Sequence, residues 1–103
     1  MAQMPPPSEP DKLPSRELLE QRHSFPCRYT FKVIGEADEG LQGRVTDCIQ
    51  RELRTNMQPP SSIRTTKGGR HQSVTVEPTC PDADAVLRLY AELRKVEGVM
   101  FLF

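Results

Sequence analysis

The sequence predicts an α+β fold in which two amphipathic helices cover one face of a four-stranded antiparallel sheet. Two segments carry apolar residues at helical spacing, and the segments around them alternate apolar with polar residues. A glycine pair, Gly68-Gly69, can close a β-hairpin between the two halves. The resulting order is strand, helix, strand, strand, helix, strand, which is the β-α-β-β-α-β arrangement of ferredoxin-like folds. Right-handed crossovers then place the first and third strands in the centre and the second and fourth at the edges.

Residues 1–24 are expected to form a disordered, proline-rich tail ahead of a folded domain over residues 25–103. Met1–Pro14 contain five of the ten prolines, among polar residues. Such a segment cannot bury enough apolar surface to offset the entropy lost on ordering.

Within this tail, a short helix is expected over residues 15–22, with Ser15 as its N-cap. Its apolar residues are Leu18 and Leu19. Because a helix this short is unstable alone, it either frays or docks on the domain.

The first strand of the domain is expected over Arg28–Ile34, ended by Gly35. The apolar residues that alternate along it toward one face are Tyr29, Phe31 and Val33. A helix is expected over Ala37–Leu53 with Asp38 as its N-cap, because its apolar residues form one stripe. That stripe consists of Leu41, Val45, Cys48, Ile49 and Leu53.

The hairpin is expected over Ile63–Val76, after Pro59-Pro60 have ended the preceding helix. On its second arm, Val74 and Val76 face the helices. A second helix is expected to start near Pro81 and to stop at Gly98. Its buried stripe consists of Val86, Leu89, Tyr90, Leu93 and Val96.

The last strand, Val99–Phe103, is apolar on both faces. On an edge strand this pattern exposes apolar surface unless something covers it, so Met100 and Leu102 are the candidate interaction edge. Either the Leu18-Leu19 segment of the same chain or a second copy of the protein would cover it.

Composition argues against several classes of protein. The fourteen basic and fourteen acidic side chains cancel, which leaves no long-range field to attract nucleic acid or anionic lipid. The three cysteines are far apart and form no Cys-x-x-Cys pair, so they are interpreted as reduced thiols of a cytoplasmic protein. No metal site, cofactor, signal peptide or membrane span is expected.

Several segments together resemble the YbeD-like family, small bacterial proteins of unknown function. The resemblance covers residues 18–103 and is carried by Phe25-Pro26, Tyr29–Gly35, Thr65–Gly68, Ser73–Val76 and Leu89–Leu93. The hairpin is one residue longer than is usual in the family, and His71 stands nearest to the place of the family's tyrosine. The family is similar in fold to ACT domains, regulatory modules that bind small effectors and pair with one another. Asp38-Glu39-Gly40-Leu41 resembles the turn that ACT domains place after their first strand.

The best candidate for a ligand site is Lys67-Gly68-Gly69-Arg70, because two flexible glycines between two cations can cradle a phosphate or carboxylate. Lys32, on the exposed side of the first strand, is a further candidate. The alternative interpretation is a solvated hairpin tip. No Walker loop, metalloprotease motif or nucleophile elbow occurs, so an enzyme is not expected.

These observations favour a non-enzymatic regulatory or interaction domain that acts through a protein partner, a second copy or a small anionic effector. The alternative function is RNA binding through basic residues of the exposed sheet face and the hairpin tip. Those residues are Arg28, Lys32, Arg64, Lys67 and Arg70. The alternative is the weaker one, because the exposed face of the central strands lacks aromatic side chains on which bases could stack.

Overall fold

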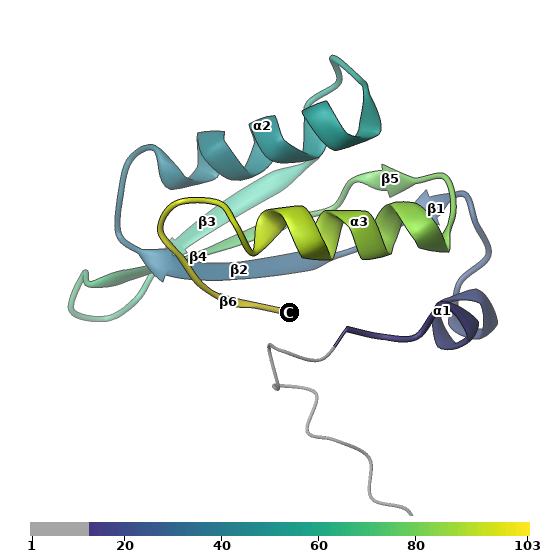
Figure 1. Ribbon diagram of the computed structural model, residues 1–103. Helices are drawn as coiled ribbons and strands as arrows, with labels where there is room; N and C mark the ends of the chain where they lie inside the picture. The colour runs from purple at the N-terminus through teal and green to yellow at the C-terminus, as the bar shows by residue number, and fades with distance from the viewer. Residues whose placement is uncertain (1–12) are drawn as a thin grey trace, which may run out of the picture.

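The structure, a computed structural model, describes residues 13–103. One antiparallel sheet has the strand order β3-β4-β2-β6. Its strands are β2 (Phe31–Glu36), β3 (Ser61–Thr65), β4 (His71–Val76) and β6 (Val99–Leu102). The helices α2 (Leu41–Leu53) and α3 (Ala83–Leu93) lie on the same side of this sheet (Figure 1). The predicted fold class and strand order are therefore confirmed.

The core lies between the sheet and these two helices. Phe31 and Val33 of β2 and Val74 and Val76 of β4 are fully buried, as their alternation predicts. The helices contribute most of the stripes predicted for them, but Leu53 is only half-buried. Helix α3 ends at Leu93 and not at Gly98, so Val96, also half-buried, lies beyond it. The buried apolar residues of the helices are Leu41, Val45, Cys48 and Ile49 from α2, and Ala83, Ala85, Val86, Leu89, Tyr90 and Leu93 from α3.

The prediction of one strand over Arg28–Ile34 is wrong at both ends. A separate two-residue strand, β1 (Cys27–Arg28), pairs with β5 (Thr79–Cys80) in a second antiparallel sheet. Between the two sheets the Tyr29 N–H donates to the Pro78 carbonyl at 3.0 Å, but Pro78 has no N–H to return. The regular ladder therefore breaks there.

At its other end, β2 continues through Gly35 instead of stopping at it. The reason is a close approach by the turn that precedes β6. A Cβ atom on Gly35 would lie 2.3 Å from the Gly98 carbonyl oxygen, which no side chain could accept. Gly35 thus serves the contact between β2 and β6 and does not end the strand.

Both helices begin later than predicted. Helix α2 starts at Leu41 with Gly40 as its N-cap, and Asp38 is not the cap. The Asp38 carboxylate instead accepts the Gly40 N–H at 2.8 Å, which stabilises the turn before the helix. Helix α3 starts at Ala83, and the Asp82 side chain caps it by accepting the Ala85 N–H at 2.8 Å.

The short N-terminal helix is present as α1 (Arg16–Arg22), with Ser15 as the N-cap that accepts the Leu18 N–H at 3.1 Å. It docks: Leu19 is buried, the helix packs against α3, and Arg16 forms an ion pair with Asp84. The disorder expected for residues 1–12 lies outside the described residues. Across residues 13–103, no helix is long and apolar enough to cross a membrane.

Candidate interaction site

The last strand carries a β-bulge that the sequence pattern did not indicate. Val99 pairs with Gly35, Phe101 with Ile34 and Leu102 with Val33, so β6 uses one residue more than β2 over the same length. Val99 and Leu102 therefore both face the helices although they are three residues apart. Leu102 is buried in the core with 4% of its surface exposed. Its assignment to an exposed interaction edge is wrong for the side chain, because the bulge inverts the alternation.

The bulge leaves a different set of apolar side chains exposed. Met100 and Phe101 are 48% and 43% exposed. Phe101 shares the open face of the sheet with its partner Ile34, which is half-buried. Phe103 exchanges two backbone hydrogen bonds with Lys32, at 3.0 and 2.8 Å, and thus lies on the same face. We call the group Ile34, Met100, Phe101 and Phe103 the β6 patch.

The backbone of β6 also faces outward. In an antiparallel ladder, residues whose N–H and C=O point to one neighbour alternate with residues whose groups point the other way. Because Phe103 is bonded to Lys32 of β2, the N–H and C=O of Leu102 point to the free edge of the sheet. Leu102 thus belongs to the edge through its backbone, while its side chain belongs to the core.

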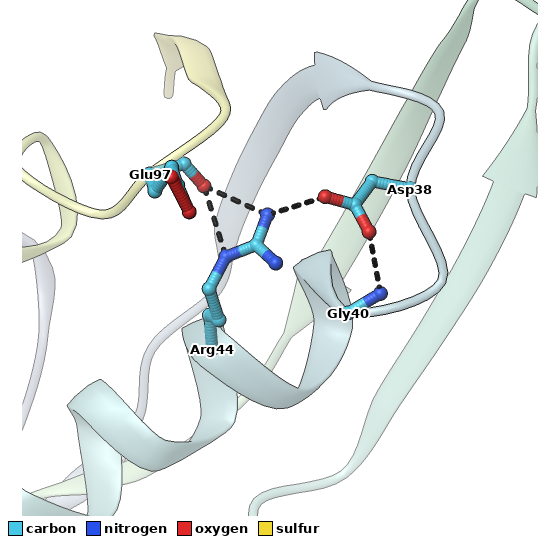
Figure 2. A network of polar contacts seen from close by, with 4 residues as sticks. All are labelled: Asp38, Gly40, Arg44 and Glu97. Carbon is cyan, nitrogen blue, oxygen red and sulfur yellow. Dashed lines mark hydrogen bonds and ion pairs between the residues drawn. The ribbon is translucent and has the colours of Figure 1, made fainter.

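An arginine bridge holds the turn that leads into β6 (Figure 2). The Arg44 guanidinium donates to the Glu97 carbonyl through Nε at 3.1 Å and Nη2 at 3.0 Å, and to Asp38 Oδ2 at 2.9 Å. The Gly40 N–H and then Arg44 hold the pKa of the Asp38 carboxyl below its ordinary value. The bridge ties the turn before α2 to the turn before β6, and it neutralises Arg44 within the molecule.

The surface beside this bridge is unsuited to an anion. A hollow of about 480 Å³ there is lined by three carboxylate residues, Glu36, Asp38 and Glu97, together with Arg44, Gly98, Val99 and Met100. The turn that resembles the ACT-domain turn thus lies in acidic surroundings. Repulsion by these carboxylates disfavours a negatively charged effector at this place.

The candidate ligand residues of the hairpin tip lie together in one turn, but the turn is exposed to solvent. Gly68 and Gly69 have positive φ angles of 97° and 76°, and a Cβ atom on either would meet nothing within 4 Å. Lys67 and Arg70 are exposed beside them. The Ala37 N–H donates to the Arg70 carbonyl, which places the tip at the end of β2.

Lys32 is not brought to this tip. It lies near the start of β2, four residues before Glu36 and thus about 13 Å away along the strand. The structure therefore assembles Lys67, Gly68, Gly69 and Arg70 in one exposed turn and places Lys32 beside the β6 patch.

The described residues contain no group of three or more His, Cys, Asp or Glu side chains that could hold a metal ion. An apolar hollow of about 210 Å³ lies past the end of α2, which is small for a ligand pocket. Its lining is mostly Met57, Ile49, Leu53 and the prolines Pro59, Pro60, Pro78 and Pro81. Nothing in this arrangement points to catalysis.

Comparison with known proteins agrees with the fold. The family described as "Protein of unknown function (DUF493)" matches residues 20–103. A UPF0250 protein of Shewanella sp. (strain ANA-3) is 37% identical over 83 residues, which are 81% of this chain and 88% of that protein. One from Shewanella oneidensis is 36% identical over the same shares.

Solved structures show the same architecture. Protein HP0495 from H. pylori superposes with a TM-score of 0.63 at 14% identity, covering 98% of both chains. The ACT domain from GTP pyrophosphokinase of Chlorobium tepidum superposes with a TM-score of 0.52 at 20% identity, covering 75% of this chain and 95% of that domain. The resemblance to the YbeD-like family is confirmed, and the chain belongs to the DUF493 family, whose function is unknown.

Proposed function

We propose that this protein is a non-enzymatic interaction module that pairs with a second copy of itself through β6, and that its role is regulatory. The observation that supports this most is the β6 patch. It places exposed Met100 and Phe101 on an edge strand whose opposite face is packed under helices. Exposed apolar surface of this kind at a free sheet edge is typical of a pairing surface.

A second copy suits this edge better than the Leu18-Leu19 segment of the same chain does. The N-terminal helix α1 packs against α3, and Phe101 stays 43% exposed with α1 in place. The β6 strands of two copies can run antiparallel about a two-fold axis. The N–H and C=O groups on the free edge of one β6, those of Leu102 among them, would then bond to the free edge of the other β6. The β6 patches of the two copies would then lie next to each other on the open face of the joined sheet, with apolar side chains in contact.

Charge also permits self-association. The formal net charge is zero, so two copies carry no net repulsion at long range. Lys32 lies at the border of the β6 patch, where its charged end can stay in water. The likeness in fold to an ACT domain taken from a GTP pyrophosphokinase is compatible with a regulatory role, because the resemblance noted in the sequence is to a family whose fold is similar to that of ACT domains.

The test is sedimentation of the full chain over a range of concentrations, with two variants. Phe101→Glu introduces a charge into the β6 patch, and Ile63→Glu makes the same change on the opposite edge strand, β3. Phe101 and Ile63 have the same exposed fraction, 43%. We expect the wild type and Ile63→Glu to dimerise and Phe101→Glu to weaken dimerisation at least tenfold, about 1.4 kcal/mol. A wild type that remains monomeric, or equal weakening by both variants, would contradict the proposal.

RNA binding is the alternative that the same face offers, because Phe101 and Phe103 lie there with Lys32 and Arg64. Recognition by stacking uses aromatic side chains on such a face. The aromatic side chains here lie on the edge strand, not on the central strands. We expect no binding of a short single-stranded RNA. Binding that weakens steeply with added salt, and that Lys32→Glu abolishes, would favour the alternative.

A further inference from the structure

Two of the three cysteines, distant in the sequence, are direct partners across β1 and β5. Cys27 pairs with Cys80, and Arg28 with Thr79. The next step of the ladder is the hydrogen bond from the Tyr29 N–H to the Pro78 carbonyl. Hydrogen-bonded positions recur every second residue, so the cysteines occupy such a position, with Cα atoms about 5.5 Å apart and side chains on the same face.

The Cα separation lies within the range that a disulfide spans, whereas the Cβ atoms must come closer for the bond to close. Disulfides span Cα separations of about 4.4–6.8 Å, most often about 5.5–6 Å, with Cβ atoms about 3.5–4.5 Å apart. Directly opposed residues have Cβ atoms about 4.5–5.5 Å apart, and a hydrogen-bonded pair lies toward the wider end, so closure needs an approach of about 1–2 Å. Strands β1 and β5 are two residues long and lie outside the four-stranded sheet, so they can approach without disturbing its ladder.

The two thiols differ in access. Cys80 is fully buried, and burial together with the neighbouring Cys27 raises the pKa of its thiol to about 12. Cys80 is therefore a protonated thiol at neutral pH. Cys27 is half-buried, so its sulfur is the one that a small reagent can reach.

We propose that Cys27 and Cys80 form a reversible cross-strand disulfide when the protein meets a hydroperoxide such as hydrogen peroxide. The Cys27 thiolate attacks a peroxide oxygen, the O–O bond breaks, and the products are Cys27 sulfenic acid and hydroxide, which the proton lost by Cys27 converts to water. The Cys80 sulfur then attacks the Cys27 sulfur, and the S–O bond breaks. The departing hydroxide takes the Cys80 proton as water, so two thiols lose two electrons and one peroxide becomes two waters.

The bond fastens the N-terminal arm to the domain. In the reduced protein, α1 and β1 are held by the buried Leu19, the Arg16–Asp84 ion pair and the short β1–β5 ladder. The disulfide adds a covalent tie between the segment before β2 and the segment before α3. Oxidation thereby suppresses detachment of the arm, and reduction permits it.

The test treats the full chain with hydrogen peroxide and counts free thiols after denaturation. We expect the count to fall from three to one, with a peptide that joins Cys27 to Cys80 in a non-reducing digest. The midpoint of thermal unfolding should rise by about 10 °C and return with a dithiol reductant. Amide exchange over residues 16–28 should slow on oxidation.

Cys48 provides the matched control, because it is buried in α2 and is not paired across a strand. Cys48→Ala should still form the disulfide, with its count falling from two to none. Cys27→Ser should form none. Cys80→Ala should leave Cys27 to oxidise to sulfinic acid, and Cys80→Ser serves the same purpose if that variant folds poorly. Disulfides between chains, loss of the Cys48 thiol, or no linked peptide would each overturn the proposal.

Discussion

The two edge strands of the sheet are built in opposite ways. Strand β3 is exposed along its whole length, consists mainly of serine, threonine and arginine, and follows Pro59-Pro60. Polar side chains and nearby prolines discourage another strand from adding to an edge. Strand β6 exposes Met100 and Phe101 and has no such protection. The pairing proposed through β6 would therefore use the less protected of the two edges.

The largest effect on the difference between the two edges is expected from a change at Gly35, where β2 and the turn before β6 approach closely. Gly35→Ala would place a Cβ atom 2.3 Å from the Gly98 carbonyl oxygen. We expect the free energy of unfolding to fall by about 3 kcal/mol or more, because backbone must move. Gly43→Ala is the control: its Cβ atom meets nothing within 4 Å, and alanine favours a helix by about 0.5–1 kcal/mol. Chemical denaturation measures both, and equal losses would contradict this role of Gly35.

The next largest effect concerns the arginine bridge. Arg44→Met removes the hydrogen bonds to the Glu97 carbonyl and to Asp38, and we expect a loss of about 2 kcal/mol because a charged donor is involved. Amide exchange should accelerate in β6 and stay unchanged in β3. The matched variant Arg64→Met, an exposed position on β3, should change stability by less than about 0.5 kcal/mol. Equal acceleration in both edge strands would show that the bridge does not act on β6 in particular.

Alkaline pH tests the core that both edges share. The Tyr90 hydroxyl lies 3.0 Å from that of Tyr29, and burial, then this hydrogen bond, raises the pKa of Tyr90 far above its ordinary value. The unfolded chain therefore releases this proton first, so stability is complete below about pH 10 and falls as the pH rises. We expect Tyr90 to account for about 1 kcal/mol of loss between pH 10 and pH 11.

Tyr90→Phe should remove that part of the pH dependence. The Cys80 thiol, whose pKa is also raised, contributes with the same sign in both proteins and cancels in the comparison. Denaturation curves recorded at each pH provide the measurement. An unchanged slope in the variant would show that Tyr90 ionises as readily in the folded protein as in the unfolded one.

The smallest effect on stability is expected for the exposed side chains of the two edges. Phe101→Ser and Ile63→Ser should each change the free energy of unfolding of the monomer by less than about 1 kcal/mol, because both side chains are half in water. The two variants should differ in association alone, with Phe101→Ser the weaker dimer. A large loss of stability for Phe101→Ser would mean that the β6 patch is part of the core.

The hydrophobic pattern was enough to predict the sheet, its strand order and the two covering helices. Apolar spacing is a local property, and Phe31, Val33, Val74 and Val76 needed only an alternating backbone to face the helices. The N-cap Ser15 was likewise readable from its neighbours. Of the candidate site, the sequence indicated an apolar last strand and a glycine turn between two cations.

Tertiary structure alone decided which side chains of these elements are exposed at the surface and which are brought together. The bulge in β6 arises from its pairing with Gly35 and the turn at Gly98, and it buries Leu102 while it exposes Phe101. The pairing of Cys27 with Cys80 joins two segments that have no relation along the chain. Both depend on contacts between residues far apart in the sequence, and a local pattern does not record such contacts.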